Sequence, residues 1–205
     1  MESLAYVLTS GWASGVNVYA TLFVTGLVGR YGDVESVPDV LQRTDVLLFT
    51  AALSGVEFVA DKIPFLDSAW DAVHTVIRPT VGAVLGALLA GEAGDLSEAV
   101  GAVLGGTTAL ASHAAKAGLR LAVNASPEPV SNVVLSLAEN AAVVTVLLVA
   151  VDHPWVALAI AGALLVAAGT LAVLLIQLIR RGWGRLTGRP PVEPAGNPRS
   201  PIRRN

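Results

Sequence analysis

The sequence contains no cysteine and few charged residues. Without cysteine, the 205-residue chain can form no disulfide framework. Only 14% of its residues are charged, whereas an ordinary soluble domain has about 25%. Hydrophobic residues make up 54% of the chain, which excludes a disordered protein as well as a typical cytosolic enzyme. The class that remains is a polytopic membrane protein.

The few charges are unevenly distributed along the chain. Residues 180–205 contain seven arginines and one acid, which gives a net charge of +6, whereas residues 1–179 carry −9. Arginines that directly follow an apolar segment indicate the cytoplasmic side. We therefore predict a multi-pass protein of the inner (cell) membrane whose carboxyl terminus is cytoplasmic. Residues 1–180 would form a transmembrane helical domain, and residues 181–205 a disordered basic tail that does not bind nucleic acid.

Six apolar segments predict an all-α transmembrane helix bundle. Most have the roughly 20 residues that a span requires, although the second is short. Three segments, a loop and three further segments would form two inverted three-helix repeats. Counting back from a cytoplasmic carboxyl terminus places the amino terminus in the cytoplasm as well. The predicted spans are residues 3–29, 46–61, 65–89, 97–123, 130–151 and 154–179.

Charged residues recur at helical spacing within the third and fourth spans. A short linker at Gly94 makes these two helices antiparallel neighbours, so residues equally far from Gly94 should lie at the same depth. On this basis we predict that Asp67 pairs with Arg120, that Asp71 pairs with Lys116 and that the two histidines lie close together. The charged faces comprise Asp67, Asp71, His74 and Arg78 on the third span and His113, Lys116 and Arg120 on the fourth.

Glycines continue the same two faces. Counted from Gly94, Gly82 and Gly86 should meet Gly105 and Gly101, which lets the two backbones approach closely. Gly-rich helix faces of this kind could also pair with a second copy of the chain to form a homo-oligomer.

Further ionisable residues lie within other spans. Because a charge at the centre of a span costs about 2.5 to 3.5 kcal/mol, we expect a polar cavity that opens to the cytoplasm. Either Glu57 or Glu139, or else a ligand, should supply the acidic partner of Arg78. His74 and His113 are the candidates for a metal or proton role, and we expect no cofactor. The candidate substrate or ion site comprises Glu57, Asp61, Asp67, Asp71, His74, Arg78, His113, Lys116, Arg120, Glu139 and Asn140.

Several motifs resemble a family of small bacterial six-helix integral membrane proteins described as a domain of unknown function. The resemblance covers residues 5–180 and implies a membrane fold without implying an activity, substrate or cofactor. At Asn140 the chain departs from the family, in which an acid is usual. The motifs are Glu57-Phe-Val-Ala-Asp-Lys-Ile-Pro-Phe-Leu-Asp67, Arg78-Pro-Thr, His113-Ala-Ala-Lys116, Arg120-Leu-Ala-Val-Asn124 and Ser136-Leu-Ala-Glu-Asn140.

Three functions are compatible with these residues. The first is a small transporter or channel for a small or lipid-linked substrate that is anionic or zwitterionic, with proton coupling through Glu57 and Glu139. Alternatively, the protein is an intramembrane enzyme on a lipid-linked substrate, although it lacks the hydrolase elbow, zinc-protease and phosphate-loop motifs. The third is an accessory membrane subunit, in which buried ion pairs only fix how the helices pack.

Overall fold

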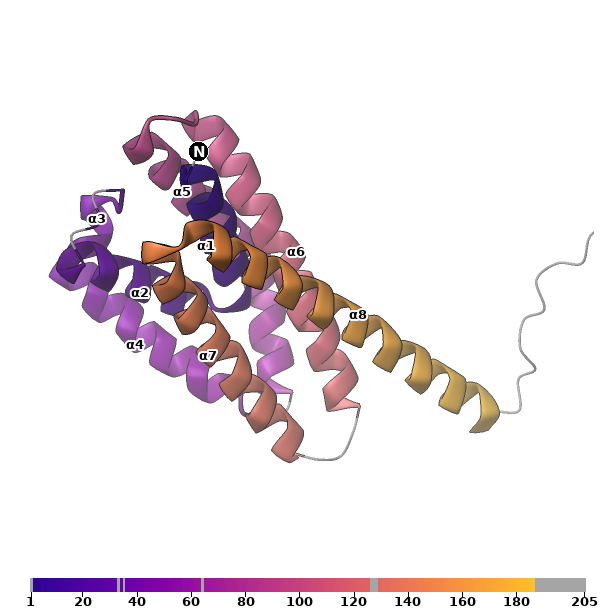
Figure 1. Ribbon diagram of the computed structural model, residues 1–205. Helices are drawn as coiled ribbons and strands as arrows, with labels where there is room; N and C mark the ends of the chain where they lie inside the picture. Colours follow the sequence, from indigo (N-terminus) through magenta and orange to yellow (C-terminus); the bar gives the residue numbers. More distant parts are fainter. Residues whose placement is uncertain (1, 33, 35, 64, 126–128, 187–205) are drawn as a thin grey trace, which may run out of the picture.

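The structure is a computed structural model that describes residues 2–32, 34, 36–63, 65–125 and 129–186. These residues form eight α-helices and no strand (Figure 1), which confirms the predicted all-α fold. The helices are α1 (Glu2–Val16), α2 (Val18–Tyr31), α3 (Asp39–Gln42), α4 (Thr44–Ala60), α5 (Leu66–Ala93), α6 (Glu98–Asn124), α7 (Pro129–Asp152) and α8 (Pro154–Leu186).

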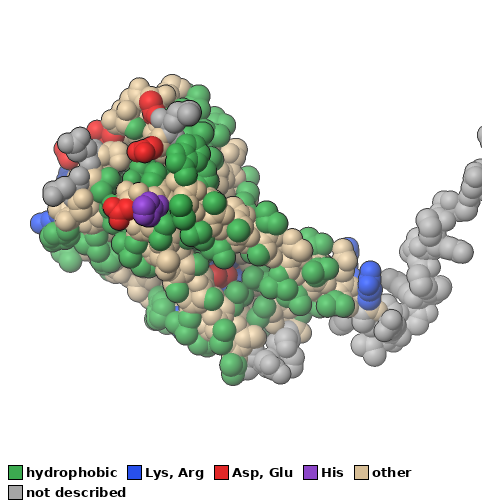
Figure 2. All heavy atoms as spheres, in the orientation of Figure 1, with side chains coloured by type: hydrophobic (Ala, Val, Ile, Leu, Met, Phe, Trp, Pro, Cys, Tyr) green, Lys and Arg blue, Asp and Glu red, His purple; other side chains and the backbone are tan. Residues whose placement is uncertain are grey.

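Three segments of the described chain are long and apolar enough to cross a membrane. They are Leu66–Ala93 in α5, Val130–Asp152 in α7 and Pro154–Arg181 in α8. Hydrophobic side chains are spread over the whole visible face, and most of the charged side chains on it lie toward its two ends (Figure 2). The chain is therefore a membrane protein, in which the exposed apolar side chains face lipid.

The prediction of one continuous helix over residues 3–29 was wrong. The helix breaks at Asn17, whose φ of −147° and ψ of 101° are those of extended backbone. The Asn17 side chain accepts a hydrogen bond from the backbone N–H of Ala20 at 2.8 Å and so caps the start of α2. An asparagine that satisfies a free N–H group can begin a new helix in the middle of an apolar segment.

The break turns the chain back toward the end of the bundle from which it came. The Ser3 hydroxyl at the start of α1 donates to Asp95 in the linker between α5 and α6. Val37 and Leu41, which follow α2, pack in one hydrophobic cluster with Val7 of α1. Both ends of the α1–α2 pair therefore lie at the same end of the bundle, and we call the pair a re-entrant hairpin because it enters and leaves the bundle at that end.

We call the two ends of the bundle the acidic end and the arginine end. The acidic end contains the start of α1, the residue 32–43 loop, the α5–α6 linker and the α7–α8 turn. The Tyr6 hydroxyl of α1 donates a 3.0 Å hydrogen bond to the Val151 carbonyl and so joins α1 to the α7–α8 turn. The arginine end contains the linker after α4 and the end of α8. The amino terminus was predicted to lie at the end opposite the residue 30–45 loop, and the re-entrant hairpin overturns this prediction.

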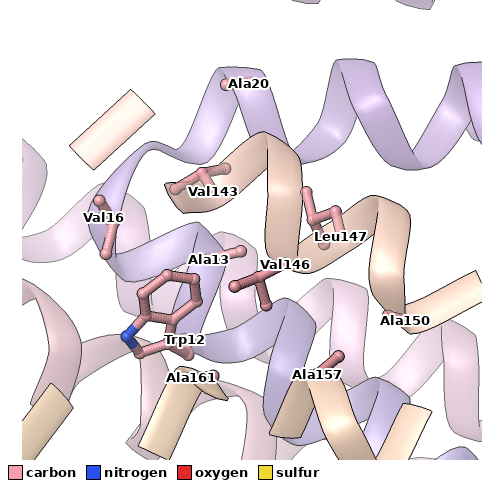
Figure 3. Close-up of a cluster of buried hydrophobic side chains, with 10 residues drawn as sticks. All are labelled: Trp12, Ala13, Val16, Ala20, Val143, Val146, Leu147, Ala150, Ala157 and Ala161. Atoms are coloured by element: carbon pink, nitrogen blue, oxygen red, sulfur yellow. The ribbon is translucent and has the colours of Figure 1, made fainter. Parts of the chain in front are cut away.

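Helix α1 lies at the centre of the bundle. It packs against α5, α6, α7 and α8, and most of its residues are buried. Around the break, Trp12 and Val16 of α1 contact a cluster completed by Val143 and Val146 of α7 and by Ala157 of α8 (Figure 3). This apolar cluster holds the end of α1 in place inside the bundle.

Glycines set the distance between α5 and α6, as predicted. A Cβ atom on Gly86 would lie 2.3 Å from the Gly101 carbonyl oxygen, and one on Gly105 would lie 2.3 Å from that of Gly82. Gly11 of α1 approaches the Gly105 carbonyl in the same way, at 2.7 Å. These glycine faces are filled by helices of the same chain, and the homo-oligomer stays a prediction.

The second half of the chain follows the predicted spans closely but extends the last one. Helix α8 continues to Leu186, past the predicted boundary at residue 180, and residues 187–205 of the predicted tail lie outside the described residues. The two inverted three-helix repeats are not confirmed, because the first half begins with the re-entrant hairpin whereas the second begins with the continuous helix α6.

Candidate functional site

A cluster of buried ionisable side chains lies between the end of α1 and the arginine end of the bundle. Its members come from α4, α5, α6 and α7 and from the residue that caps α4, and all but one have side chains no more than 5% exposed. The exception is Glu139, at 12%. This charged cluster consists of Glu57, Asp61, Asp67, Asp71, Arg78, Lys116, Arg120 and Glu139.

Arg78 binds two carboxylates of the charged cluster. Its Nη2 atom donates to Glu57 Oε1 at 2.6 Å, and its Nη1 atom lies 2.9 Å from Asp71 Oδ1. The prediction that Glu57 or Glu139 must supply the partner of Arg78 is thus confirmed for Glu57. Because both partners are completely buried, this pair ties α4 to α5 in a region where either charge alone would be costly.

Lys116 and Arg120 of α6 bind the other three carboxylates of the charged cluster. Lys116 Nζ donates to Asp61 Oδ2 at 3.0 Å, and Arg120 Nη2 donates to Glu139 Oε2 at 2.6 Å. Arg120 Nη1 lies 3.7 Å from Asp67 Oδ2, which confirms the predicted pair of α5 and α6. The predicted pair of Asp71 and Lys116 was wrong, because Asp71 forms its ion pair with Arg78, and Lys116 forms its ion pairs with Asp61 and Glu139.

The basic side chains also bind the carboxyl ends of two helices. Where α1 ends, the Gly15 carbonyl accepts from Arg78 at 3.4 Å and the Val16 carbonyl accepts from Lys116 at 2.9 Å. Where α4 ends, the Asp61 carbonyl accepts from Arg120 at 2.6 Å. The last carbonyls of a helix have no partner within it and carry partial negative charge. The breaks after α1 and α4 therefore add acceptors to the site.

The two histidines have different hydrogen-bond partners. His113 Nδ1 lies 2.8 Å from Arg78 Nη1, and because a guanidinium can only donate, this nitrogen must be unprotonated. Its other ring nitrogen lies 3.1 Å from the Thr75 hydroxyl. His74 Nδ1 faces the Trp70 carbonyl at 2.8 Å and must carry a proton. Both histidines thus take part in hydrogen bonds of the polar network, and a metal or proton role for them stays a prediction.

Amide side chains complete the polar network. Asn124, the last residue of α6, donates to both Asp67 oxygens, at 3.1 and 3.0 Å. Asn140 accepts a 2.8 Å hydrogen bond from Asn17 and so anchors the break in the first helix. Thr75 was not singled out by sequence analysis, because one threonine among many gives no signal before its partner is known.

The charged cluster contains more acid than base. It has five carboxylates and three basic side chains, so it carries an excess of two negative charges when all of them are ionised. Five buried carboxylate oxygens of the cluster accept no hydrogen bond within the described part of the chain: Glu57 Oε2, Asp61 Oδ1, Asp71 Oδ1 and Oδ2, and Glu139 Oε1. Of these, Asp71 Oδ1 still lies 2.9 Å from Arg78 Nη1. Such an excess is expensive away from water, so the cluster has capacity to bind positive charge.

A cavity lies directly beside the charged cluster. Within the described ranges, no group of three or more His, Asp or Glu side chains has the arrangement of a metal site. The cluster is filled by its own ion pairs, and the cavity beside it, of about 230 Å³, is bordered mainly by apolar side chains of α6, α7 and α8. This apolar cavity touches the charged cluster at Lys116 and Glu139, and the polar cavity that opens to the cytoplasm stays a prediction.

Comparisons with known proteins identify the family. No curated protein and no solved structure matches the chain. One family model, described as a domain of unknown function (DUF4126), matches residues 4–174. The match includes α1 to α7, most of α8 and every member of the charged cluster, and it confirms the family resemblance predicted from the motifs. The chain therefore belongs to the DUF4126 family.

Proposed function

We propose that the protein is a small proton-coupled membrane transporter whose charged cluster binds the coupling protons. The excess of two carboxylates over basic side chains carries this proposal. A cluster that only fastened helices together would be most stable with matched charges, because each unmatched buried charge is destabilising. Two bound protons would balance the cluster, and their release would change how its members pair.

The broken helix supports the same function. Discontinuous helices inside a membrane are typical of transporters, in which the ends of half-helices and freed backbone carbonyls hold ions and substrates. Here the end of α1 meets Arg78 and Lys116, and the end of α4 meets Arg120. A change in the charge of the nearby carboxylates would alter how strongly these cations bind the two helix ends, so proton binding can be converted into helix movement.

The orientation we propose places the arginine end in the cytoplasm, in agreement with the excess of Arg and Lys there. With α1 and α2 as a re-entrant hairpin, α4 to α8 provide five crossings. The amino terminus then lies outside the inner membrane and the carboxyl terminus inside. This topology differs from the six spans predicted from the sequence only in its first segment.

Single cysteines test this topology, because the natural chain contains none. We expect Glu2→Cys and Glu92→Cys to react with a membrane-impermeant maleimide added to intact cells. Arg181→Cys should react only after the membrane has been permeabilised. If the first segment were a continuous span, Glu2→Cys would instead be protected like Arg181→Cys. All three positions are exposed, so their reactivity reports the side of the membrane.

Proton flux tests the proposed function. In proteoliposomes with a trapped pH-sensitive dye and an imposed membrane potential, we expect the wild-type protein to move protons. Glu57→Gln and Glu139→Gln should reduce the rate several-fold, because each removes a carboxylate of the charged cluster without changing its shape. The control is Asp45→Asn, which removes a carboxylate from an exposed ion pair with Arg43. A wild-type rate equal to that of protein-free liposomes would overturn the proposal.

A further inference from the structure

A cavity opens between α7 and α8 beside the charged cluster. The two helices meet at the acidic end and diverge toward the arginine end (Figure 1). The cavity between them, of about 230 Å³, is closed on its inner side by α6 and by Trp12 of α1. Ala138 and Ala142 of α7 and Ala168 of α8 line it. Their small side chains leave room that larger residues would fill.

The walls of this cavity suit a hydrocarbon chain. An apolar cavity stays dry, and about 150 Å³ is enough to bind benzene. The present cavity is larger, and both α7 and α8 contain segments apolar enough to cross a membrane. The medium outside the cavity is therefore the hydrocarbon of the bilayer. A lipid chain can enter sideways between the two helices without crossing a polar barrier.

The polar members of the wall select the head group. Glu139 Oε1 accepts no hydrogen bond from the described residues. Lys116 Nζ, 3.7 Å from the other oxygen of Glu139, uses two of its three N–H groups, for the Val16 carbonyl and Asp61. A hydroxyl group can donate to the carboxylate and accept from the ammonium. A phosphate or carboxylate head would instead add negative charge to a cluster that already has an excess of it.

We propose that this cavity binds a neutral lipid alcohol, with the hydrocarbon chain between α7 and α8 and the hydroxyl between Glu139 and Lys116. This inference rests on the proposed function, for which it supplies the substrate class. It also replaces the anionic or zwitterionic substrate predicted from the sequence. The hydroxyl would contact the same carboxylate that binds Arg120, so binding of the alcohol and the charge of the cluster would be linked.

Trp12 provides a direct test because it lines the cavity and is 4% exposed. A variant that keeps this tryptophan alone is made by replacing Trp70, Trp155 and Trp183 with Phe. We expect 1-decanol with a bromine on its last carbon to quench Trp12 fluorescence saturably, and unbrominated decanol to reverse the quenching. The methyl ether of decanol cannot donate a hydrogen bond, so it should compete about tenfold less well. Decanoic acid should also compete poorly.

Two substitutions on α8 form the matched control. Ala168→Phe fills the cavity and should abolish saturable quenching, whereas Ala163→Phe, at an exposed position outside the cavity lining, should leave it unchanged. Equal competition by decanol and its ether would overturn the hydroxyl site. Unchanged quenching in Ala168→Phe would overturn the cavity as the binding site. If the brominated decanol does not quench the variant that keeps Trp12 alone, and Ala168→Phe changes the oligomeric state, the cavity instead binds a second copy of the chain.

The quenching assay measures binding without transport, so the two proposals can fail separately. Proton flux without saturable quenching would overturn the lipid alcohol and leave proton transport standing. Saturable quenching without proton flux would confirm the binding site and overturn the proposed transporter.

Discussion

Arg78→Met is expected to lower the free energy of unfolding by about 3–5 kcal/mol, the range observed when one partner of a buried ion pair is removed. The guanidinium lies 2.6 Å from Glu57 and 2.9 Å from Asp71, and it also donates to the Gly15 carbonyl. Methionine fills a similar volume but offers no charge and no donor. Two buried carboxylates and the end of α1 would lose their partner together. Reversible unfolding in mixed micelles measures the loss.

An exposed ion pair of similar geometry provides the control. Arg43 lies 2.7 Å from Asp45, but the two side chains are 63% and 65% exposed. Arg43→Met should therefore change the unfolding free energy by about 1 kcal/mol or less. Adding Glu57→Leu to Arg78→Met should recover part of the stability, because it removes one of the orphaned charges. A loss from Arg78→Met as small as that from Arg43→Met would contradict the role given to the buried pair.

The pairing of α5 with α6 could be predicted because a short linker fixes their register. Two antiparallel helices joined at Gly94 place residues at matching depths, which gave the glycine contacts and the pair of Asp67 with Arg120 correctly. The same counting failed for Asp71, because it assumed that each charge reaches straight across to the neighbouring helix. The side chain of a helical residue points back toward the start of its own helix. Arg78 therefore reaches Asp71, two turns earlier on α5.

The remaining errors came from contacts between residues distant in the sequence. Asp61, directly after α4, displaces Asp71 as the partner of Lys116 on α6, and no spacing within either helix reveals that approach. The break at Asn17 was missed for a similar reason. Its side chain caps α2 and donates to Asn140 of α7, and a single Asn in an apolar segment fits an unbroken helix equally well until that partner is known.

Gly86→Ala is expected to destabilise the protein by about 3 kcal/mol, at the upper end of the cost of overpacking, although it adds only one methyl group. The new Cβ atom would lie 2.3 Å from the Gly101 carbonyl oxygen and 3.2 Å from the Gly105 Cα atom. Both are backbone atoms of α6, so neither can rotate away as a flexible side chain could. The two helices must separate, which also weakens the pair of Asp67 with Arg120 that spans them.

A glycine on the outside of the bundle distinguishes this crowding from a general effect of alanine. Gly162 of α8 is exposed, and a Cβ atom there would meet nothing within 4 Å. Gly162→Ala should leave the stability unchanged or raise it by up to about 1 kcal/mol, because alanine favours the helix. Gly101→Ala should be as harmful as Gly86→Ala, since its Cβ atom would lie 2.3 Å from the Gly86 carbonyl oxygen. Thermal unfolding in detergent gives the melting temperatures of the three variants. Equal melting temperatures for Gly86→Ala and Gly162→Ala would contradict the close packing of α5 and α6.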